Sequence, residues 1–172
     1  MVLVKLSSKL YDRFKLKTNM PLEKYNKKRR FDVTPEPKGV VSKKGENRFV
    51  VQEHHARALH YDFRLEIGGV LKSWAIPKVP PKTTAKKRLA MQTEDHPVDY
   101  IDFSGVIPKG NYGAGRVIIW DKGNFDLEKN KSNEIIFILK GLKLKGKYIL
   151  IKPKGSRFGK KAWLFFKMKE EK

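Results

Sequence analysis

The stretch that decides the fold reads Leu59-His60-Tyr61-Asp62-Phe63-Arg64-Leu65-Glu66-Ile67. Its odd-numbered residues are apolar or aromatic, whereas its even-numbered residues are all ionisable. Because successive side chains of a β-strand point to opposite faces, this alternation predicts a strand with one face on a core. The same periodicity places His60, Asp62 and Arg64 together on the other face.

A glycine pair follows this stretch and joins it to a second apolar run, residues 70–76. Two glycines between two such runs predict a tight β-hairpin. Pairing of Ile67 with Val70 would set Arg64 opposite Ser73, Asp62 opposite Ala75 and His60 opposite Pro77. Since cross-strand neighbours lie about 5 Å apart, these small partners leave open space above the ionisable row, as a binding site requires.

Short strand-like runs separated by turn residues continue along the chain. We expect strands at 48–53, 87–93, 116–120, 134–139, 148–152 and 163–168, with a hairpin at 140–147. The glycine-rich residues 105–115 predict a structured loop, and apolar spacing predicts short helices at 2–16 and 22–30. Such a series of short strands is typical of a barrel or a sandwich, so the predicted fold class is mainly β.

The 172-residue chain carries a net charge of +21, which favours a polyanionic partner such as nucleic acid. The excess lies at the two ends: residues 1–50 and 121–172 each carry a net +9, whereas residues 51–120 carry only +3 and all four histidines. We expect residues 1–30 to form a basic helical extension, whose order the sequence leaves open, and residues 31–172 a single domain.

Several protein classes are excluded by composition. The chain has no cysteine, which excludes disulfides, zinc ribbons and thiol catalysis. It has no apolar run of the roughly 18–20 residues that a membrane helix needs. Walker, HExxH and Lys-x-Asp-Gly motifs are absent as well. We therefore expect a cytoplasmic monomer with no membrane partner.

The ionisable face of the 59–67 strand is a candidate metal site. A single His-x-Asp pattern is more often a solvated strand face with alternating charges. His54, six residues upstream of His60, favours a metal site over a solvated strand face, because two imidazoles and a carboxylate are a common facial ligand set for a divalent metal. Arg64, one step further along the face, would then contact an anion bound by that metal.

A second cluster lies at Glu94-Asp95-His96-Pro97-Val98-Asp99-Tyr100. His96 precedes a proline, which places it in an extended or turn segment. Alone, it would be a loop histidine with a satisfied hydrogen bond, but the carboxylates and tyrosine around it favour a phosphate-contacting or proton-transferring group. Lys78 and Arg88 could complete an anion pocket. His55 has the opposite parity to His54 and is expected to be structural or exposed.

Taken in order, these clusters resemble the 3′-phosphoesterase module of bacterial DNA ligase D and its stand-alone archaeal relatives. The resemblance is most specific in His60-Tyr61-Asp62-Phe63-Arg64 with the downstream Glu94-Asp95-His96-Pro97. Further matching stretches are 25–31, 34–37, 49–59, 65–66, 70–78, 88–90, 98–100 and 103–108.

The resemblance implies a small closed β-barrel of about eight strands with short flanking helices. It implies a metal-dependent enzyme that removes a 3′-terminal ribonucleotide and then the 3′-phosphate, with Mn²⁺ as cofactor, although the ligands would also suit zinc or cobalt. The implied metal ligands are His54, His60 and Asp62. The implied catalytic and phosphate-side residues are Arg64, His96, Tyr100 and Arg88, with supporting positions at Lys78, Gln52, Glu94, Glu36 and Arg29.

One position departs from the family pattern. Where relatives often carry an aspartate before the phenylalanine of the N-terminal basic motif, this chain has Arg30, which puts in doubt any contact built on that acid. The expected partners are DNA or RNA-primed 3′ ends and a separate ATP-dependent DNA ligase. Two alternatives stay open: a catalytically weak, basic nucleic-acid-binding repair module that acts with a ligase, and a structural partner of such a ligase.

Overall fold

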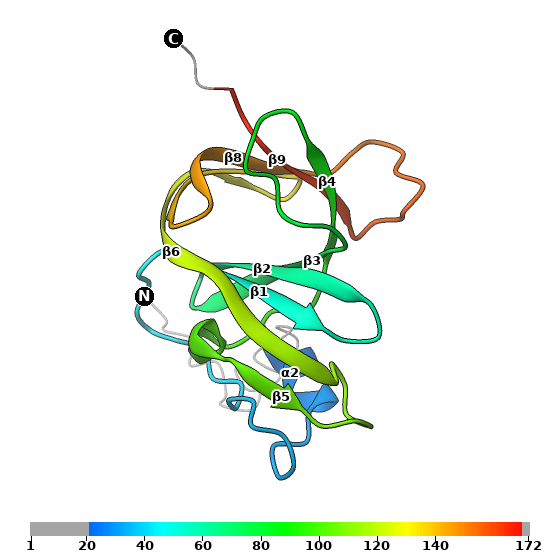
Figure 1. The fold of residues 1–172 in the computed structure, drawn as a ribbon. Helices are drawn as coiled ribbons and strands as arrows, with labels where there is room; N and C mark the ends of the chain where they lie inside the picture. Colours follow the sequence, from blue (N-terminus) through cyan, green and yellow to red (C-terminus); the bar gives the residue numbers. More distant parts are fainter. Residues whose placement is uncertain (1–20, 170–172) are drawn as a thin grey trace, which may run out of the picture.

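The computed structural model describes residues 21–169, which form nine β-strands, one short α-helix and one 3₁₀ helix (Figure 1). The strands are β1 (Arg48–His55), β2 (Leu59–Ile67), β3 (Val70–Ile76), β4 (Lys87–Gln92), β5 (Gly105–Ile107), β6 (Gly115–Lys131), β7 (Glu134–Gly141), β8 (Lys145–Ile151) and β9 (Ala162–Lys167). The helices are α2 (Glu23–Lys28) and η1 (Val98–Asp102).

Eight of the strands close into an antiparallel barrel. Their order is β1-β2-β3-β4-β9-β8-β7-β6, and pairing of β1 with β6 completes the circle. β6 is 17 residues long, and its first half pairs with β1 and with the extra strand β5, whereas its second half pairs with β7. The expected eight-stranded barrel is therefore confirmed, with one strand added outside it.

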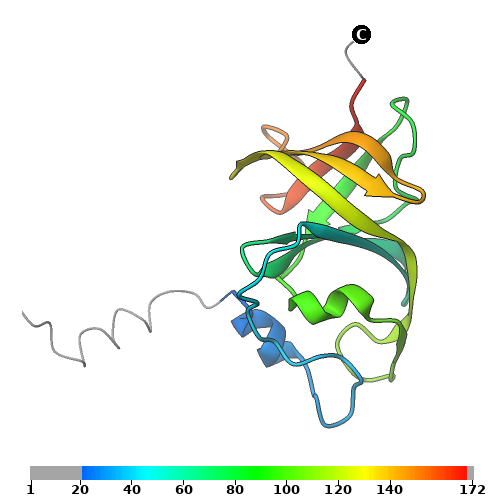
Figure 2. The same cartoon turned by 90° about the vertical axis from the view of Figure 1, so that its left-hand side faces the viewer.

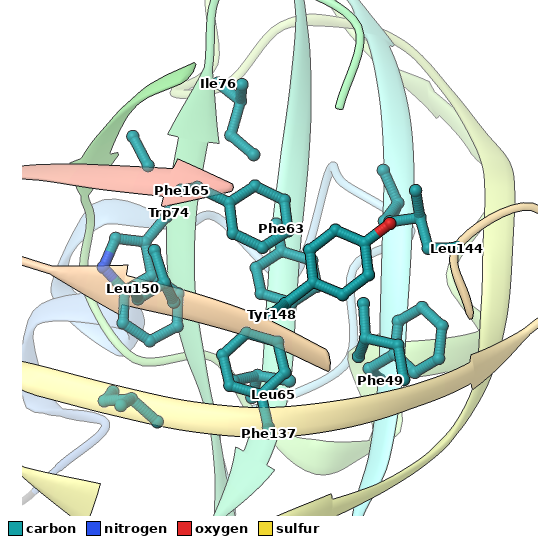
Figure 3. Close-up of a cluster of buried hydrophobic side chains, with 14 of the residues drawn as sticks. Phe49, Phe63, Leu65, Trp74, Ile76, Phe137, Leu144, Tyr148, Leu150 and Phe165 are labelled. Atoms are coloured by element: carbon teal, nitrogen blue, oxygen red, sulfur yellow. The ribbon is translucent and has the colours of Figure 1, made fainter. Parts of the chain in front are cut away.

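Aromatic side chains fill the interior of the barrel. Phe63 stacks on Phe165 with a centroid distance of 4.7 Å and on Phe137 at 5.8 Å (Figure 3). Phe63 is fully buried, as the alternation of β2 predicts, whereas Leu59 at the start of the strand is exposed. The hairpin register is also confirmed: Ile67 pairs with Val70, and the pairs Arg64–Ser73 and Asp62–Ala75 follow from it.

A second layer covers the outer face of β1, β2 and β3. Figure 2 shows α2 and η1 below these strands, on the side away from the rest of the barrel. Tyr25 of α2 and Tyr100 of η1 belong to a buried cluster with Val50 of β1 and Leu71 of β3. The ionisable face of β2 is therefore largely enclosed rather than open to solvent: Arg64 is 3% exposed and Glu66 is 2% exposed.

Other elements differ in part from the sequence expectations. The helix expected at 22–30 is present as the shorter α2, and residues 22–30 pack on the barrel face through Leu22 and Tyr25. The helix expected at 2–16 lies outside the described residues. The 105–115 loop contains β5, and the strand expected at 116–120 continues to Lys131. Within residues 21–169, no helix has both the length and the apolar character to cross a membrane.

Candidate metal and phosphate site

Three side chains with metal-ligand chemistry converge on the outer face of the β1–β2 pair. His54 and His60 are direct cross-strand partners, and Asp62 lies two residues further along β2. His54 Nδ1 is 3.4 Å from Asp62 Oδ2, and His60 Nε2 is 3.7 Å from Asp62 Oδ1. One potential ligand atom from each residue lies within 4.8 Å of the other two. Among residues 21–169, no other group of three histidine or acidic residues meets this geometry.

The hydrogen bonds of the two imidazoles orient their free nitrogens toward Asp62. His54 Nε2 bonds the carbonyl oxygen of Gly113 at 2.9 Å, and His60 Nδ1 bonds that of Ala58 at 3.0 Å. Since a carbonyl only accepts, these two nitrogens carry the protons, and the lone pairs of His54 Nδ1 and His60 Nε2 remain available. A backbone acceptor on the second ring nitrogen is the usual support of a metal-bound histidine. The donor set therefore fits a divalent cation.

Positive charge next to Asp62 keeps this carboxylate ionised. Burial alone would raise the pKa of Asp62, but the positive charge of Arg64 outweighs burial and lowers the pKa below its usual value. Arg64 approaches Asp62 Oδ2 at 3.3 Å. An ionised carboxylate beside two neutral imidazoles would leave a bound divalent cation with a net positive charge, which can bind an anion.

Arg64 is held rigidly by polar and aromatic neighbours. Its Nε donates to Gln52 Oε1 at 2.7 Å, and one terminal nitrogen donates to Ser73 Oγ at 2.9 Å. The guanidinium lies over the Tyr100 ring at 4.8 Å. Gln52 is itself fixed by donating to the carbonyl oxygens of Tyr100 and Phe103. η1 and the residue after it thus position Arg64 through Gln52.

His96 is a buried, neutral histidine. Its backbone pairs with Leu71 of β3 through two hydrogen bonds. Its Nδ1 bonds the carbonyl oxygen of Glu94 at 2.9 Å, so Nε2 is the acceptor for the Arg29 guanidinium at 3.0 Å. Burial, followed by the charges of Arg64 and Arg29, lowers the pKa of His96 well below its ordinary value of 6.5.

Arg29 connects the N-terminal segment to this site. It forms ion pairs with Glu36 at 2.9 Å and Glu94 at 3.0 Å, and all three side chains are buried. Its guanidinium lies 3.9 Å from the centre of the Tyr25 ring. The Tyr100 hydroxyl donates to the same oxygen of Glu36. Burial would raise the pKa of Glu94, but its own amide, Arg29 and Lys28 lower the pKa below the usual value.

A cavity of about 330 Å³ joins the two clusters. Its lining includes the metal-ligand triad, Arg64 and Ala75 together with Arg29, Glu36, Glu94, His96 and Tyr100. The lining holds two guanidinium groups and three carboxylates, so a divalent cation at the triad would supply the excess positive charge that a phosphate oxyanion needs.

Comparison with known proteins identifies the family. Residues 52–152, more than half of the chain, match the family described as DNA Ligase D 3′-phosphoesterase domain. The chain belongs to this family. It is 48% identical over 164 residues to a multifunctional non-homologous end joining protein, LigD, of Mycolicibacterium smegmatis, which covers 88% of this chain and 21% of that protein.

Two further relatives agree with this assignment. LigD of Mycobacterium tuberculosis H37Rv is 48% identical over 158 residues, covering 88% of this chain and 20% of that protein. LigD of Pseudomonas aeruginosa PAO1 is 47% identical over 161 residues, covering 89% of this chain and 19% of that protein. The chain thus spans about a fifth of the length of the curated relatives it matches.

Not every residue predicted from this family lies at the cavity. Lys78 is exposed just after the end of β3. Arg88 is the cross-strand partner of Phe165, on the barrel-interior side of β4, and its Nε donates to the Val79 carbonyl oxygen. Neither lines the cavity, so their phosphate contacts stay predictions. Arg30 is exposed and pairs with Asp32. His55 is exposed and bonds Glu53.

Sequence reasoning missed two residues of the 105–115 loop. Gly113 supplies the carbonyl oxygen that orients His54, and Tyr112 lines the cavity beside Lys28 and Arg29. An aromatic residue between glycines was the available signal. Gly113 has a φ of +76°, a backbone conformation that favours glycine and that a non-glycine residue rarely adopts.

Proposed function

We propose that the chain is a metal-dependent 3′-end-healing phosphoesterase that acts in non-homologous end joining. It would remove a 3′-terminal ribonucleotide as a phosphodiesterase and then the remaining 3′-phosphate, which leaves a 3′-hydroxyl for an ATP-dependent DNA ligase. The proposed cofactor is Mn²⁺. The observation that carries the proposal is the convergence of the free ring nitrogens of His54 and His60 on Asp62, beside a cavity lined by two guanidinium groups.

Each group of side chains has a separate role in the proposed reaction. His54, His60 and Asp62 would hold the cation. When bound, a divalent cation there polarises a phosphoryl oxygen and lowers the pKa of a coordinated water. Arg64 would bind the non-bridging phosphate oxygens, and because its hydrogen bonds to Gln52 and Ser73 already fix it, it would need no reorganisation as charge develops.

His96 has a positioning part in this proposal. Its Nε2 accepts from Arg29 and its pKa is lowered, so it is neutral and holds no proton on the nitrogen that faces Arg29. We therefore assign it to orienting the Arg29 guanidinium at the phosphate side rather than to protonating the leaving group. Arg29 would neutralise charge on the phosphate, and Glu36 and Glu94 would limit its movement.

The experiment uses a 5′-labelled primer annealed to a template, with either one 3′-terminal ribonucleotide or a 3′-phosphate. With Mn²⁺, the first substrate should be shortened and the second dephosphorylated. His60→Ala should abolish both reactions, whereas His55→Ala, a histidine five residues away and outside the triad, should keep them. Full activity in a chelator or in His60→Ala contradicts the proposal. End binding without product under any divalent metal would favour the binding-module alternative.

A further inference from the structure

The loop that joins β8 to β9, residues 152–161, carries five basic residues and no acidic residue. Figure 1 shows it as an orange loop that projects from the wall of the barrel. Four of the basic side chains are exposed, namely Lys154, Arg157, Lys160 and Lys161. None of the five forms an ion pair with a carboxylate within residues 21–169. Their positive charge is therefore available to a polyanion.

The lysines of the β7–β8 hairpin show that a basic sequence alone does not make such a surface. Lys140 pairs with Asp126 at 2.7 Å, and the ammonium group of Lys143 donates to the Trp120 carbonyl oxygen at 2.6 Å. Leu142, which lies between these two lysines, is 86% exposed. This hairpin has an exposed apolar residue among lysines that already have partners, so it is a matched control for the β8–β9 loop.

An aromatic side chain lies among the free charges of the loop. Phe158 is 51% exposed, and the Arg157 guanidinium lies 4.9 Å from the centre of its ring. The Phe158 amide donates to Ser156 Oγ at 3.2 Å, and the Gly159 amide donates to the Ser156 carbonyl oxygen at 3.1 Å, so a tight turn presents the ring to solvent. A nucleic-acid strand fits both features, because its bases stack on aromatic rings and its phosphates contact cations.

The end of the loop adjoins the metal and phosphate cavity. The Gln92 amide at the end of β4 donates to the Lys161 carbonyl oxygen at 2.8 Å. The next two residues after Gln92, Thr93 and Glu94, line the cavity. The loop and the cavity therefore share one edge of the barrel, and a single nucleic-acid end can contact both.

We propose that the β8–β9 loop binds an unpaired stretch of the nucleic acid whose 3′ end is processed in the cavity. Phe158 would stack on one base, and Lys154, Arg157 and Lys160 would contact the phosphates next to it. The stretch is unpaired because a base inside a duplex is already stacked between its neighbours. The inference takes nucleic acid as the partner from the proposed function, and it adds which part of that partner this loop binds.

The test measures fluorescence anisotropy with two 5′-labelled DNA probes, the single strand dT12 and a blunt duplex of the same length. Phe158→Ala should weaken dT12 binding by at least about fivefold, the lower end of the range for one base stacked on an aromatic ring. It should leave duplex binding unchanged. Leu142→Ala, the matched exposed apolar residue, should leave the binding of both probes unchanged.

The phosphate contacts and the stacking are tested separately. Lys160→Ala should reduce the slope of log K for dT12 against log salt by about 0.7, the value for one single-strand phosphate contact. Lys140→Ala should keep the wild-type slope, because its ammonium group pairs with Asp126. Phe158→Trp should keep the affinity for dT12, and dT12 should quench the fluorescence that the added indole contributes.

Three results would overturn the proposal: wild-type affinity of Phe158→Ala for dT12, an equal loss of affinity for the duplex, or an added indole in Phe158→Trp that dT12 does not quench. Absence of dT12 binding to the wild-type protein would overturn it as well. Both probes end in a 3′-hydroxyl and the buffer contains a chelator, so the result depends on neither the metal nor turnover. The phosphoesterase proposal can therefore fail without changing this result, and the reverse also holds.

Discussion

Replacing Gln52 with leucine should destabilise the protein and disorder the candidate site together. Gln52 is fully buried and makes three hydrogen bonds: its Nε2 donates to the carbonyl oxygens of Tyr100 and Phe103, and its Oε1 accepts from Arg64. Leucine has a similar size but cannot make any of them. The Phe103 carbonyl oxygen and the Arg64 Nε–H would therefore lose their partner in a buried environment, whereas the Tyr100 carbonyl oxygen keeps its bond from the Phe103 amide.

The magnitude follows from the kind of each bond. Two neutral hydrogen bonds contribute about 1 kcal/mol each, and the bond from the charged guanidinium about 1.5–3 kcal/mol. Burial of the apolar leucine side chain offsets roughly 1.5 kcal/mol of the free energy lost with the three hydrogen bonds. The net loss should be about 2–3.5 kcal/mol of unfolding free energy. Turnover should fall more than substrate affinity, because Arg64 keeps its charge but loses its orientation.

Urea denaturation followed by far-UV circular dichroism measures the stability change. Gln92→Leu is the matched control, because Gln92 is a strand glutamine with a single side-chain bond, from Trp163. It should cost about 1 kcal/mol or less. Equal losses in the two variants would refute the reasoning, as would a Gln52→Leu protein with wild-type stability and turnover.

Three further outcomes are expected. Mn²⁺ at about 100 times its dissociation constant should stabilise the protein by about 2.7 kcal/mol, seen as a rise in melting temperature; His60→Ala should lose this rise and His55→Ala should keep it. Because the pKa of His96 in the folded protein lies well below 6.5, the unfolded chain binds more protons, and the unfolding free energy should fall as pH drops below 6.5 toward the folded value. The variant His96→Gln should reduce this acid sensitivity in melting curves. An unchanged sensitivity would argue against a neutral His96. Gly141→Ala should lower the unfolding free energy by about 1–3 kcal/mol in the same denaturation assay, because the added Cβ would lie 2.5 Å from Asp121 and 2.6 Å from Phe49. Gly45→Ala is the control and should be neutral, because nothing lies within 4 Å of its added Cβ.

The local pattern of the β2 stretch was enough to predict several features correctly. Its alternation placed Phe63 in the core and His60, Asp62 and Arg64 on one face, and the glycine pair set the register with β3. These features depend on neighbours within a few residues, because strand periodicity and a two-residue turn are local properties. The same locality explains why the mainly β class was predicted before any tertiary contact was known.

Closure of the barrel and completion of the site depended on tertiary structure. β1 and β6 pair over residues that are more than 60 positions apart in sequence, and no local pattern distinguishes this closure from a sandwich. Arg29 and His96 are 67 residues apart, and the proton position of His54 is set by a loop 59 residues away. By itself, the sequence determined which side chains share a strand face. Only the packing of the second layer on that face decided which charges are buried together, because burial and charge pairing arise from contacts between distant segments.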